Sequence, residues 1–384
     1  MRQHIRHIIL PLLAALMYAT SCTSDPDPGI VPPTTGEEMI FEAESEPLAR
    51  AVVTTSETLT NKPFKLFGDV NRTGEYYPGL KEMFGGTKVT FKNNRWDYGA
   101  KQYWLMGQEH SFVAIHPYDI PEITDISYSN STLSFKYSLP QDLNAANDLL
   151  IATHRRKYTL DSAQPVKFNF IHILPRINVA PALDEVLMYE DETDRENYPY
   201  NADEYILIRS LEIRSFKATG SFTLTPDPLA AGSMTNDKFT LGYAVETEEK
   251  LVSIKFEFED KPIKVTNNKE NVFVIDKEAP IVMIPQTFKT PLAEIVLEYT
   301  VNDDEPRRKI IIPLNGKTWE MGKMYTYKFT IEKAYTGQIK PGTFTIDVDD
   351  PLLTDDEHDD AWVWNGETID FTFDKENYKD DYKQ

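Results

Sequence analysis

Hydrophobic positions along the chain alternate with polar ones in short runs, as they do in β-strands that bury one face. In Val252–Glu259, apolar side chains occupy every second position, with Ser, Lys or Glu between them. Met324–Ile331 alternates in the same way, and Val166–Phe170 places three apolar side chains on one face. Helical periodicity is scarce beyond the first 22 residues. The pattern therefore predicts an all-β, antiparallel protein.

Turn residues separate these runs, for example Asn93–Asn94 between two β-prone segments. Further strands are predicted at Glu204–Phe216 and Gly220–Leu224. Short helices are expected at Pro78–Phe84 and, as a connection, at Pro140–Asn147. Many short strands bounded by turns are typical of β-sandwiches.

The length of the chain, 384 residues, predicts more than one such sandwich. One sandwich takes about 100 residues, so we expect two in tandem. The polar, turn-rich region before residue 166 is the expected boundary. We predict an N-terminal β-sandwich over residues 37–165 and a C-terminal β-sandwich with an acidic tail over residues 166–384.

The first 22 residues have the anatomy of a secretory signal peptide. Arg2 and Arg6 precede an apolar stretch that is shorter than the ~20 residues of a membrane-spanning helix. Three small residues then lead to Cys22, the only cysteine of the chain. This segment resembles the lipobox of bacterial lipoproteins, although Ala19 stands where leucine is commoner. We predict a lipoprotein signal peptide over residues 1–22, lipidation of Cys22 and a proline-rich tether over residues 23–36. The alternative is an ordinary signal peptide with a chance cysteine.

The amino-acid composition excludes some classes of function and structure. The chain carries 61 acidic and 40 basic side chains, a net charge of −21, which excludes nucleic acid as a partner. One cysteine excludes a disulfide framework. The 20 Tyr and 20 Phe supply enough apolar surface for a sizeable core. Acidity of this kind suits a surface that stays soluble outside the cell.

The sequence contains no catalytic motif. It has no Gly-rich phosphate loop, nucleophile elbow or paired histidine ligands. We therefore predict no enzymatic activity, no catalytic residues, no cofactor and no metal site. The acidic region Asp349–Asp360 offers carboxylates of the kind that calcium prefers, but its spacing is not that of an EF-hand. A solvated acidic loop is the alternative to a calcium site.

Several local motifs follow one another in a characteristic order. They are Met39–Phe41, Leu48–Val52, Trp96 and Trp104, Phe112–Tyr118, Phe170–Ile177, Gly220–Phe222, Met283–Gln286, Ile312–Leu314, Trp319, Gly322–Lys323 and Tyr325–Tyr327. Each motif alone is weak. The series resembles the fimbrillin family, the major and minor subunits of type V pili and related surface lipoproteins of Gram-negative anaerobes. The resemblance covers most of residues 37–335.

The resemblance implies a fold and a mode of assembly. Members are exported as lipoproteins to the outer membrane and have two transthyretin-like β-sandwich domains. In polymerising subunits, an Arg-specific protease removes an N-terminal strand, and a donor strand of the next subunit fills the groove. Arg50 stands where that cut would fall, before Ala51. Anchor-type relatives keep their leader, so uncut Arg50 is the alternative.

The C-terminal region offers a candidate donor strand. Ile369, Phe371 and Phe373 alternate with polar residues and fall on one face of a strand. Alternatively, they belong to the last strand of the second sandwich. Trp362 and Trp364 also share one face, where they would either stack on a sugar or pack in a domain interface.

These observations together predict a structural, tip or accessory subunit of a surface-exposed fimbria that supports adhesion. Its expected partners are other pilus subunits, a glycan or protein receptor, and the outer membrane through the lipid. The alternative is a non-polymerising surface lipoprotein that binds carbohydrate.

Overall fold

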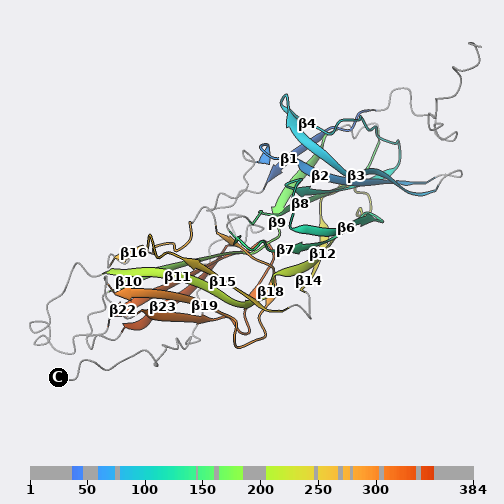
Figure 1. Ribbon diagram of the computed structural model, residues 1–384. Helices are drawn as coiled ribbons and strands as arrows, with labels where there is room; N and C mark the ends of the chain where they lie inside the picture. Colours follow the sequence, from blue (N-terminus) through green and yellow to red (C-terminus); the bar gives the residue numbers. More distant parts are fainter. Residues whose placement is uncertain are drawn as a thin grey trace, which may run out of the picture.

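The structure is a computed structural model of the chain. It describes residues 37–45, 59–73, 78–143, 146–159, 164–184, 205–245, 250–266, 271–276, 280–301, 307–333 and 339–349. Figure 1 shows an elongated molecule of strands and loops, with the N-terminal strands towards one end and the last strands towards the other. The predicted all-β class is confirmed. The transthyretin-like topology of two tandem domains stays a prediction.

An eight-stranded sheet occupies the N-terminal part of the molecule (Figure 1). Seven strands follow the order β1-β9-β8-β5-β2-β3-β4, and β13 pairs with β8. The strands are β1 (Phe41–Ser45), β2 (Phe64–Arg72), β3 (Gly79–Lys92), β4 (Arg95–Asp97), β5 (Glu109–His116), β8 (Leu150–Lys157), β9 (Val166–His172) and β13 (Thr235–Asn236). The pairs are antiparallel except for β1 and β9, which are parallel.

The eight-stranded sheet curls until its two edge strands, β1 and β4, come into contact. Strand twist favours such curling, and the apolar side chains that face inward stabilise it. They form a cluster that we call the N-terminal core: Met39, Phe41, Leu59, Phe64, Leu66, Phe84, Val89, Trp96, Trp104, Phe112, Ala114, Leu150, Ala152, Tyr158, Val166, Phe168 and Phe170.

A second sheet covers the outer face of the first, with strands in the order β14-β12-β7-β6. These are β6 (Ile123–Ser129), β7 (Thr132–Ser138), β12 (Thr219–Pro226) and β14 (Phe239–Val245). Val113 and Ile115 point from β5 into the cluster between the two sheets, whereas Phe112 and Ala114 point into the N-terminal core. Phe135 stacks there on Phe222 with ring centroids 5.3 Å apart. The central strands β2, β5 and β8 of the first sheet are therefore buried on both faces.

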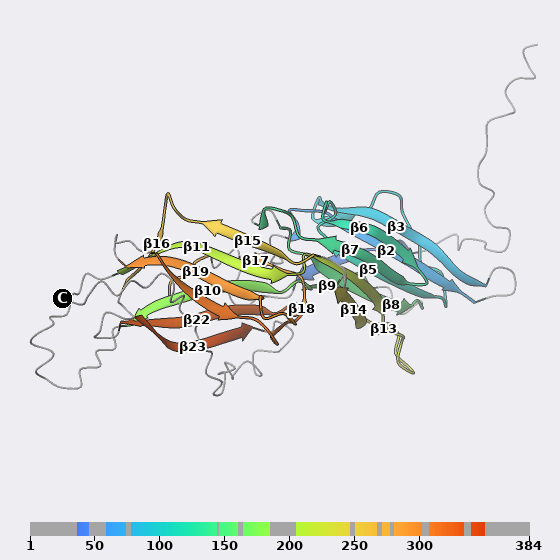
Figure 2. The ribbon, with the colours of Figure 1, turned by 60° about the horizontal axis from the view of Figure 1, so that its bottom comes forward.

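The C-terminal part consists of two larger sheets and one small one (Figure 2). One sheet has the order β17-β10-β22-β23, and the other β15-β11-β19-β20, with β16 also on β11. Their strands are β10 (Arg176–Asp184), β11 (Tyr205–Phe216), β15 (Val252–Glu257), β16 (Ile263–Thr266), β17 (Ile281–Val282), β19 (Glu294–Val301), β20 (Arg308–Pro313), β22 (Met324–Lys333) and β23 (Ile339–Asp349). β18 (Gln286–Thr287) pairs with β21 (Thr318–Trp319). The core of this part lies between the two larger sheets, and there the buried Trp319 indole donates a hydrogen bond to the Tyr327 hydroxyl at 2.8 Å.

The chain crosses from the first sheet to the C-terminal part between β9 and β10, beside a buried contact between a histidine and an aspartate. His172 Nδ1 lies 2.6 Å from Asp148 Oδ2, and both side chains are nearly inaccessible. Burial would raise the pKa of Asp148, but His172 and Arg176 lower it below its usual value. Gly322 lies against this point, and a Cβ there would approach the His172 carbonyl oxygen to 2.7 Å. The expected boundary at residue 165 stays a prediction, and β9 itself pairs with β8 and β1.

The helix expected at Pro78–Phe84 is wrong, because Gly79–Lys92 is the long strand β3. β3 pairs with β2 through two register shifts, so its apolar residues do not alternate regularly and Leu80, Met83 and Phe84 imitate helical spacing. The described residues within Pro140–Asn147 form no α-helix either. In the described parts of the chain, no helix has the length and apolar character needed to cross a membrane.

Candidate functional site: the first strand and its groove

The site residues that we predicted from the sequence lie outside the described residues. They are Cys22, Arg50, Ala51, Trp362, Trp364, Ile369, Phe371 and Phe373. The acidic region after Asp349 also lies outside. The structure does describe the segment just upstream of Arg50, Glu37–Ser45, which contains β1. We call it the first-strand segment.

The first-strand segment alternates between buried and exposed side chains. Met39 and Phe41 belong to the N-terminal core and are 0% and 2% exposed, whereas Ile40 between them is 54% exposed. The Phe41 ring stacks on Phe168 at 5.7 Å and meets the edges of three more aromatic rings, those of Phe84, Tyr98 and Phe112, at 5.3–5.7 Å. Aromatic contacts of this geometry add to the free energy gained by burial. Phe41 is therefore an anchor of the core rather than a surface side chain.

Backbone hydrogen bonds attach the segment on both sides. On one side, the parallel pairing with β9 aligns Phe41 with Val166 and Ala43 with Phe168. The Val166 amide donates to the Ile40 carbonyl at 2.7 Å. On the other side, the Met39 amide donates to the Gln102 carbonyl at 2.9 Å, and the Trp104 amide to the Glu37 carbonyl at 3.1 Å. The first-strand segment thus supplies hydrogen-bond partners to backbone groups of β9 on one side and of Gln102–Trp104 on the other.

Three acidic side chains of the segment, those of Glu37, Glu38 and Glu44, contact a polar or basic partner. The Tyr158 hydroxyl donates to Glu37 Oε2 at 2.5 Å, and burial together with this carboxylate raises the pKa of Tyr158 to about 12. Glu44 lies 2.6 Å from the Lys167 ammonium, at a partly exposed position. Solvent screens an exposed ion pair of this kind, so it contributes little to the stability of the strand.

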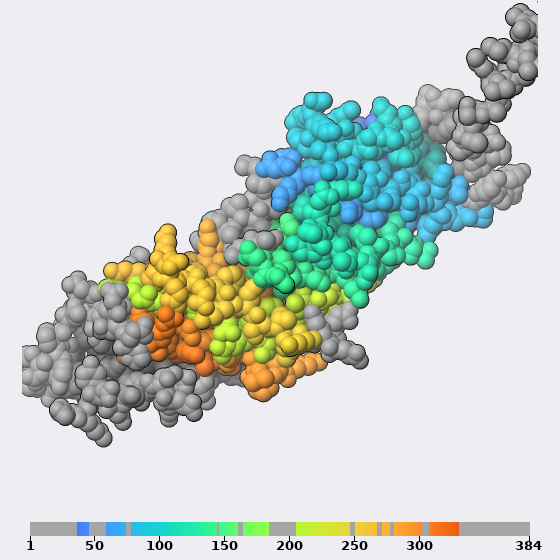
Figure 3. Space-filling view, viewed as in Figure 1, coloured from blue at the N-terminus to red at the C-terminus, as the bar shows by residue number. Residues whose placement is uncertain are grey.

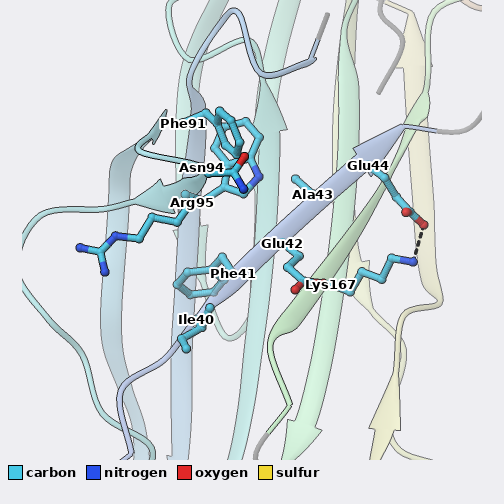
Figure 4. A pocket seen from close by; sticks show the side chains of 10 residues that line it. Ile40, Phe41, Glu42, Ala43, Glu44, Phe91, Asn94, Arg95 and Lys167 are labelled. Carbon is cyan, nitrogen blue, oxygen red and sulfur yellow. Dashed lines mark ion pairs between the residues drawn. The ribbon is translucent and has the colours of Figure 1, made fainter. Parts of the chain in front are cut away.

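A hollow of about 370 Å³ lies between β1 and β4. Residues of the first-strand segment form one wall, and Phe91, Asn94, Arg95 and Trp96 form the other. In Figure 4, Ala43 lies on the side of β1 that faces Phe91 and Asn94, with open space between them. Ala43 and Phe91 both lie at the margin of the N-terminal core and are only partly buried. The hollow is therefore an open groove at the margin of the N-terminal core, lined by apolar and charged side chains.

This arrangement suits exchange of a strand. β1 is short, lies at an edge of the sheet, and its one strand partner in the described chain is β9. Removing it would uncover a groove with apolar pockets and unpaired backbone groups, which is a template for another strand. The groove has no arrangement of catalytic groups. Within the described ranges, no cluster of His, Cys, Asp or Glu could hold a metal ion.

Sequence reasoning did not find the residues that receive the first strand. Tyr158 and Lys167 lie far from it in the chain, and single residues give no signal of a contact more than 100 positions away. The hollow was also not foreseen, since it depends on how far the sheet curls.

A model of the family described as fimbrillin-like matches residues 50–347 of the chain. None of the curated proteins is similar enough to match.

Solved structures from Bacteroides and Parabacteroides species are similar over most of the chain. A protein assigned to cell adhesion from Bacteroides uniformis is 14% identical and covers 82% of this chain and 98% of its own, with a TM-score of 0.38. A fimbrial assembly protein from Parabacteroides distasonis is 10% identical, covers 82% of this chain and all of its own, and has a TM-score of 0.34.

In the space-filling view of Figure 3, the blue N-terminal and orange C-terminal parts of this chain lie at opposite ends of the described surface.

Proposed function

The chain belongs to the fimbrillin-like family, and on that premise we propose that it is a structural, tip or accessory subunit of a type V pilus that assembles by exchange of its first strand. Family membership assigns it a fimbrial or adhesive role at the cell surface. The finer steps of this proposal are lipid anchoring through Cys22, cleavage between Arg50 and Ala51, and replacement of β1 by a strand from another subunit. The role is structural and needs no cofactor.

The observation that carries the proposal is the position of β1. The strand precedes Arg50 in the chain, yet it anchors the N-terminal core through Phe41. A cut at Arg50 would leave β1 attached only by non-covalent contacts to the rest of the subunit. Its departure would expose the pockets of Met39 and Phe41 to water, and the hydrophobic effect would favour refilling them with another strand. The matched family region begins at residue 50, which agrees with this division.

An Arg-specific protease is expected to cut the mature protein once near residue 50. The new N-terminus should be Ala51, and the product should form ladders on gels that resist heat, because exchanged strands dissociate slowly. The measurement is N-terminal sequencing combined with electrophoresis of unboiled samples. The matched control is Arg50→Lys, which keeps the charge but removes the cleavage site, and which should remain uncut and monomeric.

Other outcomes of this experiment discriminate between the functions. A cut at Ala51 followed by a strictly monomeric product would contradict strand exchange. It would then favour the non-polymerising surface lipoprotein, for which specific retention on a glycan array is the positive test. Ladders from Arg50→Lys would show that cleavage at this bond is not required.

Substitution of Cys22 by alanine is expected to abolish incorporation of labelled palmitate and to release the protein from the outer membrane. The thiol of Cys22 is the single thiol of the chain, so no other cysteine can take its place. Ser21→Ala is the matched control, since it changes the neighbouring residue and keeps the acylated position. Palmitate labelling that survives Cys22→Ala would rule out the lipoprotein assignment.

A further inference from the structure

Two lysines face each other on the outer face of the first sheet. Lys65 of β2 stands directly opposite Lys88 of β3 in the antiparallel register. Their neighbours Phe64, Leu66 and Val89 point into the N-terminal core, so the alternation of the strands turns both lysines to the opposite face. Like charges directly opposite each other on paired strands destabilise a sheet. The first sheet therefore carries an electrostatic cost at this place.

Both ammonium groups converge on one aromatic ring, that of Tyr118. Lys65 Nζ lies 4.9 Å and Lys88 Nζ 4.8 Å from the centroid of this ring. The Tyr118 amide donates a hydrogen bond to the Pro63 carbonyl at 2.7 Å, which holds the ring beside the start of β2. Cation–π contacts of this length offset part of the repulsion between the two charges. We call the side chains of Lys65, Lys88 and Tyr118 the lysine–tyrosine platform.

Acidic side chains neutralise the platform only in part. Asp119 lies 3.6 Å from the Lys88 ammonium, and the two side chains are 77% and 49% exposed, so water screens this pair. Lys65 forms no ion pair with any acidic residue that the structure describes. The platform therefore keeps an excess of positive charge at the surface.

This excess runs against the composition of the chain. The whole chain has 61 acidic and 40 basic side chains, yet residues 61–101 contain eight Lys and Arg against four Asp and Glu, a local charge of 8 − 4 = +4. In the C-terminal part, by contrast, Lys255 contacts both Glu257 at 2.9 Å and Glu298 at 3.1 Å. Basic side chains there are neutralised within the chain, whereas those of the platform face solvent.

The same face continues with a second like-charged pair. Lys92 of β3 stands opposite Arg95 of β4, and alternation places Lys92 on the face of Lys88, about 13 Å further along the strand. Figure 4 shows the Arg95 side chain pointing away from the hollow between β1 and β4. Asp97 lies one row back, where its carboxylate accepts a hydrogen bond from the Gly99 amide at 3.1 Å. The platform, Lys92 and Arg95 thus form a basic stripe along β3.

We propose that the basic stripe binds an acidic polysaccharide, a glycan chain that carries sulfate or carboxylate groups at intervals. One anionic group would lie between the ammonium groups of Lys65 and Lys88, where it accepts charge-assisted hydrogen bonds and removes their repulsion. The Tyr118 ring would pack against the sugar that carries this group, and Lys92 with Arg95 would hold a later group of the same chain. The inference rests on the adhesive part of the proposed function and is independent of strand exchange.

The shape and charge of the surface favour a polysaccharide over other polyanions. The stripe lies along exposed strands, so it suits an extended chain better than a small molecule that needs a pocket. An anionic membrane is disfavoured, because the chain has a net charge of −21 and no residue of the stripe is a large exposed aliphatic side chain. An acidic peptide would satisfy the lysines, but the ring between them suits the apolar face of a sugar.

Heparin binding to the uncut protein tests the inference. The mature chain carrying Arg50→Lys, which should stay monomeric, is titrated with heparin by calorimetry. Lys65→Ala together with Lys88→Ala should weaken binding at least about tenfold, because two charge-assisted contacts are lost. The matched control is Lys81→Ala together with Lys157→Ala, which removes the same charge from the same sheet outside the stripe and should stay within about twofold. Equal losses in the two double variants would reduce the binding to net charge and overturn the site.

The Tyr118 ring is tested apart from the charges. Tyr118→Phe keeps the ring and should bind heparin within about twofold of the native chain. Tyr118→Leu removes the ring but no charge and should bind several-fold more weakly, by about the contribution of one aromatic contact. Equal affinities of these two variants would overturn the role of the ring.

Lysine acetylation of the native chain gives a readout that needs no variant. Saturating heparin should protect Lys65, Lys88 and Lys92 from an acetylating reagent, as measured by mass spectrometry of the digested protein. Lys81 and Lys157, outside the stripe, should be labelled equally with and without heparin. Protection of these two lysines instead of the stripe would place the polysaccharide elsewhere and overturn the inference.

Further probes identify the class of ligand. Hyaluronan carries carboxylates without sulfate, so its binding would assign carboxylated chains, and binding of heparin alone would assign sulfated ones; either result supports the inference. Poly-glutamate that binds as tightly as heparin and displaces it would overturn the polysaccharide in favour of an acidic peptide. Vesicles of phosphatidylglycerol that bind through the same lysines would overturn it in favour of a membrane surface.

The outcomes also separate this inference from the proposed function. Ladders that form after cleavage at Arg50, in a protein that binds none of these polysaccharides, would overturn the basic stripe and leave pilus assembly standing. Heparin binding that depends on Lys65 and Lys88, in a protein that never forms ladders, would support the stripe and contradict strand exchange.

Discussion

Replacement of Phe41 by alanine is expected to lower the free energy of unfolding of the uncut protein by about 3–5 kcal/mol. Phe41 is 2% exposed and contacts four aromatic rings, so its removal leaves a cavity that the surrounding strands cannot close without moving. Because β1 is a short edge strand, we expect the loss to appear first as local opening of the first-strand segment. The amides of β1 and β9 should then exchange with solvent faster than those of the C-terminal sheets.

Urea denaturation gives the free energy for this comparison, and hydrogen exchange locates the change. Ile40→Ala is the matched control, since Ile40 is the preceding residue of the first-strand segment but is 54% exposed. Its effect should remain within about 0.5 kcal/mol. Equal effects of the two substitutions would mean that the segment does not dock through Phe41, and the proposed groove would lose its principal pocket.

Mild acid is expected to destabilise the N-terminal part through two buried histidines. Burial lowers the pKa of His110 and of His116 from 6.5 to about 4, because neither charged form is solvated inside the sheet. The unfolded chain therefore binds protons below pH 6.5 that the folded chain does not bind until about pH 4. The contribution of each neutral histidine to stability is fully present above pH 6.5 and is lost as the pH falls from 6.5 towards 4. Between pH 7.5 and pH 5, each histidine should therefore lower the free energy of unfolding by about 2 kcal/mol.

The free energy of unfolding measured at pH 7.5, 6.5, 5.5 and 5.0 tests this expectation. Asp148 has a lowered pKa and stays ionised in this range, so its own contribution is lost only at lower pH. A glutamine at position 116 cannot titrate, and His116→Gln should therefore remove about half of the pH dependence. A slope that is the same in this variant and in the native chain would assign the acid sensitivity to other groups.

Several elements could be predicted from sequence because local side-chain pattern decides them. The alternation of Val166–Phe170 is confirmed in β9, where Val166, Phe168 and Phe170 are all buried. The turn at Asn93–Asn94 is also confirmed, since both residues have positive φ, which asparagine tolerates. β15 forms at Val252–Glu257 as expected, yet Val252 is 36% exposed, because the strand lies at the edge of its sheet.

The remaining features depend on long-range geometry. One of the two register shifts that hid β3 lies at Gly68, where a Cβ would approach the rings of Phe112 and Phe84 to 2.8 and 3.1 Å. The parallel pairing of β1 with β9 joins residues about 120 positions apart, and the hollow between β1 and β4 follows from the curl of the whole sheet. Neither the strand that pairs with the first-strand segment nor the hollow beside it can be recognised from local sequence.

The parallel pairing of β1 with β9 has a mechanical consequence for a fibre built by strand exchange. If, under the proposed exchange, a strand near the C-terminus of another subunit took the place and direction of β1, tension would pull that strand at its N-terminal end. The same tension would pull β9 at its C-terminal end, where β9 continues into β10. Parallel strands pulled from opposite ends are loaded in shear, so their hydrogen bonds share the force instead of opening one after another. Such a joint would resist pulling along the fibre axis far better than peeling from one end.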